Sequence, residues 1–194
     1  MKNIILIGAG SQMTKDHIPT VERRGDLKIV AVIDKDFDKA KQFARIYGAK
    51  AYSDIGEIKT FNNIDAAIVC VPHNQYAPIC DTLAKNKIAT LREKPAAMSS
   101  QEMAKTISQF RKYDTYLQVC VQRRFSQIYE LVKGLIRNIG KIYSIQASYT
   151  MCVSEMSGWR GDRNVMGGGV VIDMGYHMID LLTYIFGRPD RVYA

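Results

Sequence analysis

The chain of 194 residues has little of what marks several protein classes. Its four cysteines include no CxxC pair, so neither a disulfide scaffold nor a zinc ribbon is expected, and a reduced, cytoplasmic setting is predicted. The apolar run at Ile4–Ile7 is too short for a signal peptide or a membrane span, and no membrane partner is predicted. No internal repeat or low-complexity segment is present. These absences leave an ordinary globular protein.

The formal net charge is +8, which would suit an anionic ligand or a nucleic acid. The basic residues, however, are scattered through helical stretches such as 35–41 and 105–112, with no single block interleaved with aromatics. Solvated helix faces explain this pattern better, and no nucleic-acid partner is predicted. Hydrophobic residues make up 47% of the chain, enough for one domain with a core, or one domain plus part of a second.

Short β-branched runs alternate with helical patterns over the first 122 residues. Strands are expected at 4–7, 28–33, 66–71, 87–91 and 116–121, and helices at 11–24, 36–47, 75–86 and 99–112. Alternation at this spacing predicts an α/β fold, a Rossmann-type doubly wound parallel sheet. We assign residues 1–122 to this domain.

The pattern changes after Val121, and we place a domain boundary near Gln122. Helices are expected at 123–137 and 170–186, a half-buried strand at 141–151, and the start of another strand at 191–194. One strand cannot cover the apolar face of the second helix. Residues 123–194 are therefore predicted to start an incomplete α/β domain, with an exposed apolar patch that favours a homo-oligomer.

Gly8-Ala9-Gly10 follows the first strand and opens a helix, as in a dinucleotide-binding turn. Gly8 permits the tight turn, and Gly10 lets the backbone approach a pyrophosphate at the helix N-terminus formed by Ser11 and Gln12. The third glycine of the usual pattern is replaced by Met13, which predicts looser packing of helix against strand. The fingerprint alone is weak evidence.

Asp34 ends the second strand, 24 positions after Gly10. A carboxylate there can accept hydrogen bonds from the adenosine ribose, and it would repel a 2′-phosphate. NAD is therefore favoured, although the neighbouring Lys35 keeps NADP possible. The competing interpretation is a turn aspartate at a strand end.

Glu93-Lys94-Pro95 lies directly after a short apolar strand. A lysine at the carboxyl end of such a strand points into the ligand crevice of an α/β fold. A cis Lys94–Pro95 bond would fix its direction. The alternative is a solvated lysine in a loop.

Asp173 and His177 are four positions apart in a predicted helix. A carboxylate beside an imidazole orients it and raises its basicity, which makes His177 a candidate general base. A satisfied core histidine is an equal alternative. A metal site with Asp180 lacks soft ligands, and no metal is predicted.

Together these segments resemble the Gfo/Idh/MocA family of NAD(P)-dependent oxidoreductases. The resemblance is carried by Gly8-Ala9-Gly10, Glu93-Lys94-Pro95, Gln122–Phe125, Trp159-Arg160 and the run 167–177. It implies an NAD(P)-binding Rossmann domain in residues 1–122 and a second α/β domain with a large open sheet, of which residues 123–194 would be the start and which would serve substrate binding and oligomerisation. It also implies hydride transfer between a nicotinamide and a sugar, polyol or related hydroxyl compound.

The resemblance also implies residue roles. Lys94, Asp173 and His177 would be catalytic. Pro72, Asn74, Glu93 and also Lys94 would line the cofactor site, and Arg124, Trp159 and Arg160 would bind substrate. Tyr76 stands where family members often carry a histidine, so contacts near the nicotinamide are expected to differ. The family's second domain also continues well beyond the length of this chain.

Three hypotheses follow. The first is an active oxidoreductase that is a fragment or takes its missing sheet from another chain. The second is a non-catalytic dinucleotide-binding protein, such as a truncated sensor or partner subunit. The third, a nucleic-acid or interaction module, has only the net charge in its favour. The sequence names neither the substrate nor the reaction direction.

Overall fold

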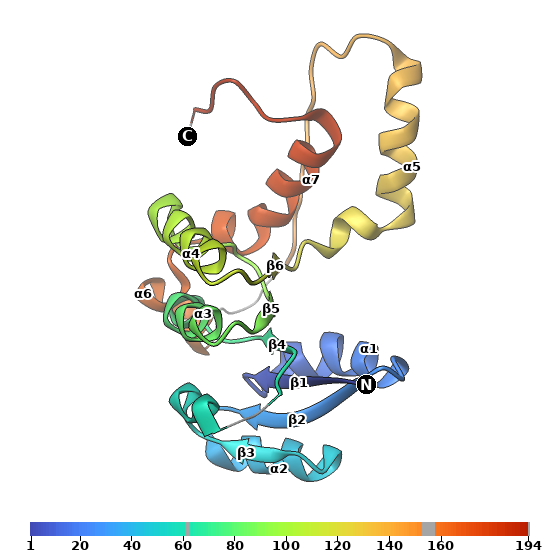
Figure 1. Cartoon of the computed structure of the whole chain (residues 1–194). Helices are drawn as coiled ribbons and strands as arrows, with labels where there is room; N and C mark the ends of the chain where they lie inside the picture. Colours follow the sequence, from blue (N-terminus) through green and yellow to red (C-terminus); the bar gives the residue numbers. More distant parts are fainter. Residues whose placement is uncertain (61–62, 153–157, 194) are drawn as a thin grey trace. The chain divides into compact units, whose positions relative to one another are not determined.

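The computed structural model describes residues 1–60, 63–152 and 158–193, and Figure 1 traces the chain. It divides into two compact units, Met1–Cys120 and Val121–Ala194. We call them unit 1 and unit 2.

Unit 1 contains a six-stranded sheet whose neighbouring strands all pair in parallel. The strand order is β3-β2-β1-β4-β5-β6. The strands are β1 Lys2–Ile7, β2 Leu27–Ile33, β3 Lys50–Tyr52, β4 Ala66–Val69, β5 Ala89–Arg92 and β6 Leu117–Val119. The predicted doubly wound parallel sheet is confirmed. The sequence did not reveal β3, because three residues at a sheet edge are too few to show a period.

Helices connect these strands. They are η1 Met13–His17, α1 Ile18–Arg23, α2 Phe37–Tyr47, η2 Ile55–Thr60, η3 His73–Gln75, α3 Tyr76–Lys85 and α4 Ser100–Lys112. Local chemistry sets several ends. Asp36 caps α2 by accepting the Lys39 N–H at 3.2 Å, and Gly48 ends that helix with φ +61°. Ser99 caps α4 by accepting the Glu102 N–H at 3.1 Å.

The core lies on both faces of the sheet, as the continuous apolar run of β1 requires. Ile4 and Leu6 pack with residues of η1, α1 and α2 on one face. Ile5 and Ile7 pack with residues of α3 and η2 on the other. The alternation follows the two-residue period of a strand.

Met13 is fully buried in the first of these clusters. The expectation of looser packing at this position is therefore wrong for the side chain itself. The surrounding helix differs instead, because Met13–His17 forms a π-helical turn before regular α-helix resumes at Ile18. Such single π-helical turns are uncommon and occur mostly as insertions in α-helices.

In the described residues of unit 2, every regular element is a helix or a helical turn. Its elements are η4 Gln122–Phe125, α5 Gln127–Leu135, η5 Ile136–Ile139, η6 Gly158–Gly161, α6 Arg163–Met166, η7 Val171–Gly175 and α7 Tyr176–Phe186. α7 packs against α5, and the Tyr184 hydroxyl donates to Glu130 Oε1 at 2.6 Å.

The predicted strand at 141–151 is wrong, since those residues form no strand. Its alternating pattern suits a half-buried strand, but a strand needs a neighbour for its backbone groups, and the described residues of unit 2 offer none. Residues 191–193 likewise form no strand, and Ala194 lies outside the described residues.

The apolar patch predicted on the helix at 170–186 is present only in part, since more of the exposed large apolar residues lie on α5 than on α7. Ile128, Leu131 and Leu135 recur at helical spacing on α5 and are 57%, 56% and 51% exposed. Ile179 of α7 is 56% exposed, whereas Leu181 is buried. The exposed residues follow one helix face, which is the pattern of a surface that packs against further structure.

One helical stretch in the described residues, Arg163–Phe186, is long and apolar enough to cross a membrane. The core helices of soluble proteins can be equally long and equally apolar. Asp173 and Asp180 lie inside the stretch, and a carboxylate in the hydrocarbon core of a bilayer is costly. Length and composition are therefore weak evidence for a span.

Candidate active site

The predicted cofactor residues of unit 1 gather at the carboxyl edge of the sheet. The strand order runs outward in both directions from the β1–β4 pair, so this pair is the point where the connections change sides. Ligands of open α/β sheets bind at such a point, beyond the strand ends. Gly8 follows β1, Asp34 follows β2, Pro72 lies shortly after β4, and Lys94 shortly after β5.

Gly8 is held where no other residue fits. Its φ is +88°, and a Cβ added there would lie 2.1 Å from the Cys70 carbonyl oxygen. The Gly8 N–H donates to the Ile33 carbonyl at 2.8 Å. Gly8 therefore joins the ends of three neighbouring strands in one tight turn, which is the role predicted for it.

Gly10 differs, because an added Cβ would meet nothing within 4 Å. Packing within the protein therefore does not require glycine here, and the space beside the backbone is open. Such space is what a pyrophosphate needs to approach a helix N-terminus closely. Ser11 is exposed, and the Gln12 side chain bonds Asp16 within the same helix.

Asp34 is half-buried and already accepts two backbone hydrogen bonds. The Ala9 N–H donates to Oδ2 at 2.6 Å, and the Asp36 N–H donates to Oδ1 at 2.9 Å. The carboxylate thus braces the glycine turn from the end of β2. Each oxygen keeps a further lone pair, so both can still accept a hydrogen bond from a ribose hydroxyl.

The segment after β4 adds polar groups to this edge. Pro72 precedes η3, and Asn74 Oδ1 accepts from Gln75 Nε2 at 3.1 Å. Lys35, which left NADP possible, donates to Gln75 Oε1 at 2.9 Å. Tyr76, at the position where the family often has histidine, is only 2% exposed, so it packs inside unit 1.

Glu93 anchors the loop that carries Lys94. Glu93 is 8% exposed, and its Oε1 lies 2.9 Å from His17 Nε2. Its Oε2 accepts the Lys94 N–H at 3.3 Å, and it also bonds the Cys120 thiol. Burial alone would raise the pKa of this carboxyl, but the hydrogen bond and charge of His17 hold the pKa below its ordinary value. Lys94 itself is half-buried.

The partners of Glu93 also shape Cys120. Burial, together with the Glu93 charge and hydrogen bond, raises the pKa of the Cys120 thiol to about 12. The thiol therefore carries its proton near neutral pH and donates a hydrogen bond to the Glu93 carboxylate.

Arg92 also stabilises the loop that carries Lys94. It is fully buried, its Nη2 donates to the Pro95 carbonyl at 2.8 Å, and its guanidinium lies 4.5 Å from the Tyr76 ring centre. The Lys94–Pro95 peptide bond is cis. The residues on both sides of Lys94 are thus held by buried charged groups.

The second cluster lies in unit 2. Asp173 and His177 are 6% and 9% exposed, the former in the π-helical turn η7 and the latter in α7. Arg160 Nε lies 3.8 Å from Asp173 Oδ2, and its guanidinium lies 4.6 Å from the Trp159 ring centre. The predicted substrate residue Arg160 and the predicted catalytic Asp173 are therefore neighbours.

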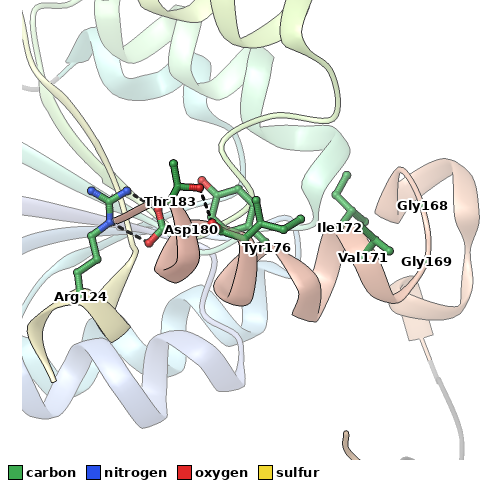
Figure 2. A pocket seen from close by; sticks show the side chains of 9 residues that line it. Arg124, Gly168, Gly169, Val171, Ile172, Tyr176, Asp180 and Thr183 are labelled. Carbon is green, nitrogen blue, oxygen red and sulfur yellow. Dashed lines mark hydrogen bonds and ion pairs between the residues drawn. The ribbon is translucent and has the colours of Figure 1, made fainter. Parts of the chain in front are cut away.

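Arg124, predicted to bind substrate, is paired with Asp180. Its Nε donates to Asp180 Oδ2 at 2.8 Å and its Nη2 to Oδ1, as Figure 2 shows. The pair raises the pKa of Arg124 and borders a pocket of about 500 Å³ in unit 2. Its lining consists of Arg124, Gly168, Gly169, Val171, Ile172, Tyr176, Ile179, Asp180 and Thr183. The pairing gives Arg124 a structural role that the sequence did not indicate.

The structure therefore places the predicted cofactor residues at the carboxyl edge of the unit 1 sheet, and it places Arg160 beside Asp173 in unit 2, with His177 buried in the helix that follows. Sequence reasoning missed His17, Arg92 and Cys120. Arg92 directly precedes Glu93-Lys94-Pro95 and ends a largely apolar strand. A charged residue at such a position could have indicated a buried structural role. His17 is 76 positions from Glu93, and no local pattern could reveal that pair.

A parallel sheet with a glycine turn, a strand-end aspartate and a braced lysine defines a nucleotide-binding α/β protein of the Rossmann class. Residues 2–121 match the model of the oxidoreductase family with an NAD-binding Rossmann fold, and residues 129–194 match the GFO/IDH/MocA C-terminal domain. The chain belongs to the Gfo/Idh/MocA oxidoreductase family, as its motifs predicted.

Named relatives agree with this assignment. The chain is 29% identical over 174 residues to trans-1,2-dihydrobenzene-1,2-diol dehydrogenase of Xenopus laevis, covering 87% of this chain and 52% of that protein. It is 27% identical over 191 residues to D-glucoside 3-dehydrogenase of Escherichia coli, covering 96% and 54%. The chain thus spans about half the length of these relatives.

Solved structures share the fold. The WlbA dehydrogenase of Bordetella pertussis, in complex with NADH and UDP-GlcNAcA, superposes with a TM-score of 0.85 at 23% identity, covering 96% of this chain and 59% of that one. KijD10, a 3-ketoreductase of Actinomadura kijaniata in complex with NADP and TDP-benzene, gives 0.85 at 20% identity, covering 96% and 57%.

Proposed function

We propose that the protein is an NAD(P)-dependent oxidoreductase that transfers hydride between a nicotinamide and a hydroxyl carbon of a sugar, polyol or related compound. The observation that carries the proposal is the placement of Lys94. It follows β5 at the carboxyl edge of a Rossmann sheet, two strands from the glycine turn, and Glu93 and Arg92 hold its loop. A lysine fixed there suits contact with a reacting oxygen near the cofactor.

The residues of unit 1 fit the cofactor. The open space beside Gly10 suits a pyrophosphate, and Asp34 suits the ribose hydroxyls. Because Asp34 would repel a 2′-phosphate and Lys35 pairs with Gln75, we propose NAD as the preferred cofactor, with Ser11, Gln12, Pro72, Asn74 and Glu93 around it. When bound, the nicotinamide supplies the hydride acceptor or donor.

Side chains of the protein would accept the proton of the substrate hydroxyl and stabilise the charge that develops. Lys94 would donate a hydrogen bond to the reacting oxygen and stabilise its developing negative charge. His177 would accept the hydroxyl proton, and Asp173 would stabilise the resulting imidazolium. Trp159 and Arg160 would contact the substrate, and Arg160 would also hold Asp173, which lies 3.8 Å away. Arg124 would contact substrate only at the cost of its pair with Asp180.

The substrate class rests on the relatives. A D-glucoside 3-dehydrogenase and a dihydrodiol dehydrogenase act, by their names, on molecules with vicinal carbon–oxygen groups. We also propose a cytoplasmic protein that forms a homo-oligomer through the exposed apolar face of unit 2 and binds neither nucleic acid nor membrane.

The test combines binding and turnover. The purified protein should quench or enhance NADH fluorescence on binding and should reduce NAD with some member of a panel of glycosides, polyols and diols. Lys94→Ala and His177→Asn should each lower kcat by roughly 10²–10⁴-fold. His177→Asn should leave NADH affinity unchanged, because His177 is not among the proposed cofactor residues. Lys105→Ala, on the exposed side of α4, is the matched control and should leave kcat unchanged.

The proposal requires that Lys94→Ala and His177→Asn each remove turnover of the same compound. Binding of NADH without turnover of any compound would instead favour the non-catalytic dinucleotide-binding protein. Absence of NADH binding would contradict both.

A further inference from the structure

A mixed set of metal-ligating atoms lies beside the Lys94 loop. Among the described residues, His17, Glu93 and Cys120 form the group whose ligand atoms, one nitrogen, one oxygen and one sulfur, all lie within 4.8 Å of one another. They come from three different elements: η1, the end of β5 and the end of β6. Three separate elements converge here on one point.

The donor set selects the ion. A thiolate disfavours magnesium and calcium, which prefer oxygen ligands, whereas imidazole, carboxylate and thiolate together suit zinc. Metal binding would release the Cys120 thiol proton to solvent. The resulting thiolate and the Glu93 carboxylate would then balance the charge of a divalent ion when the imidazole is neutral. Three protein ligands leave a fourth tetrahedral position for water or another small ligand.

The distances require only small movements. Zinc bonds of about 2.0–2.3 Å at tetrahedral angles place ligand atoms roughly 3.3–3.7 Å apart. His17 Nε2 and Glu93 Oε1 are now 2.9 Å apart, and no pair in the group exceeds 4.8 Å. Shifts on the order of 1 Å, which side-chain torsions can supply, would form the coordination geometry.

The surroundings are semi-enclosed. Glu93 is buried, whereas His17 and Cys120 are half-buried, so the ligands are positioned by packing yet an ion has a path to them. The side chains of His17 and Glu93 are 11% and 10% exposed. Desolvated ligands of this kind bind an ion more tightly than mobile surface groups, because less order is lost on binding.

We propose that His17, Glu93 and Cys120 form a binding site for a zinc-class divalent cation at the base of the Lys94 loop. Occupation would replace the present hydrogen bonds of Glu93 to His17 and Cys120 with metal bonds. The site is separate from the Asp173–His177 pair, for which no metal was predicted.

The test measures metal binding directly, without substrate or cofactor. The full chain is reduced, stripped with a chelator, and titrated with Zn²⁺ in competition with a chromophoric chelator. Co²⁺ then serves as a spectroscopic probe, because a cobalt–thiolate bond gives a charge-transfer band. We expect one equivalent of metal and a band of that kind.

Variants identify the ligands. Cys120→Ser should remove the cobalt–thiolate band and weaken Zn²⁺ binding at least tenfold, and His17→Gln should weaken it similarly. Cys70→Ser is the matched control: this cysteine also lies at a strand end of the same sheet but outside the group, and the change should alter neither. Circular dichroism and thermal melts confirm that each variant folds, and Cys120→Ala replaces any variant that does not.

Two results would overturn the proposal. One is Zn²⁺ binding of equal strength by the wild type and the Cys120 and His17 variants, which identifies adventitious surface binding. The other is a thiolate band that survives in Cys120→Ser and disappears in Cys70→Ser. Because the assay requires no turnover, its failure leaves the proposed oxidoreductase function untouched.

Discussion

His17 Nε2 lies 2.9 Å from Glu93 Oε1, although 76 positions separate the two residues in the sequence. The pair links the first helical turn after the glycine motif to the residue that precedes Lys94. The side chains are only 11% and 10% exposed, so the interaction is weakly screened by water. The cofactor turn and the Lys94 loop are therefore mechanically connected.

This pair should give unit 1 a recognisable response to acid. The pKa of Glu93 in the folded protein is below its ordinary value of 4.5, so its contribution to stability is fully present above that pH. The contribution is lost as the pH falls through the lower folded pKa. We expect Glu93→Gln to flatten the fall in free energy of unfolding below about pH 4.5, measured by urea titration at several pH values. Asp38→Asn, on an exposed carboxylate, is the control, and parallel curves for wild type and Glu93→Gln would contradict the assignment.

The two glycines of the cofactor turn should behave differently when replaced by alanine. Gly8→Ala places a methyl group 2.1 Å from the Cys70 carbonyl oxygen at a φ of +88°. It should lower the free energy of unfolding by roughly 2–4 kcal/mol, combining left-handed strain and overpacking. Gly10→Ala meets no atom within 4 Å and should leave stability unchanged.

Gly10→Ala should nevertheless weaken NADH binding at least about tenfold, because the methyl group takes the space needed by the pyrophosphate. Thermal melts and NADH fluorescence titrations measure the two effects separately. Normal NADH affinity in a folded Gly10→Ala protein would contradict the proposal that the pyrophosphate lies beside Gly10.

Asp34 and the nearby Asp36 offer a matched pair. Asp34→Asn keeps a single carbonyl oxygen where two carboxylate oxygens now accept the Ala9 and Asp36 N–H groups. We expect roughly tenfold weaker NADH binding and a smaller preference for NADH over NADPH, since the charge that repels a 2′-phosphate is gone. Asp36→Ala removes the cap of α2 and should lower the melting temperature without changing cofactor preference. An unchanged NADH-to-NADPH ratio in Asp34→Asn would remove Asp34 from the ribose site.

Arg124 and Asp180 should couple in a double-mutant cycle. The pair is doubly hydrogen-bonded, but the Arg124 side chain is 37% exposed, so solvent screening reduces its contribution. We expect a coupling energy of about 0.5–1 kcal/mol between Arg124→Ala and Asp180→Asn, measured by denaturant unfolding. Additive effects on stability, together with a raised KM in Arg124→Ala alone, would instead assign Arg124 to substrate binding.

Sequence patterns predicted the strands of unit 1 other than β3, because the signals for those strands are local. Strands β1, β2 and β4 are short apolar runs bounded by helices, and the Gly8 turn and the Lys94-Pro95 segment mark strand ends. In unit 2 the alternating pattern at 141–151 indicated a strand that the structure lacks. Alternation reports which faces of a segment are apolar, but a strand also requires a neighbour for its backbone groups.

By itself, the sequence determined the class of fold, the family and the identity of the motif residues, because each depends on spacing along the chain. Only the tertiary structure decided their partners. It showed that His17 and Cys120 bond Glu93, that Arg124 bonds Asp180, and that the Ala9 N–H donates to Asp34. Such pairs join distant segments through side chains, and their distances are set by how strands and helices pack. Sequence spacing contains no record of that packing.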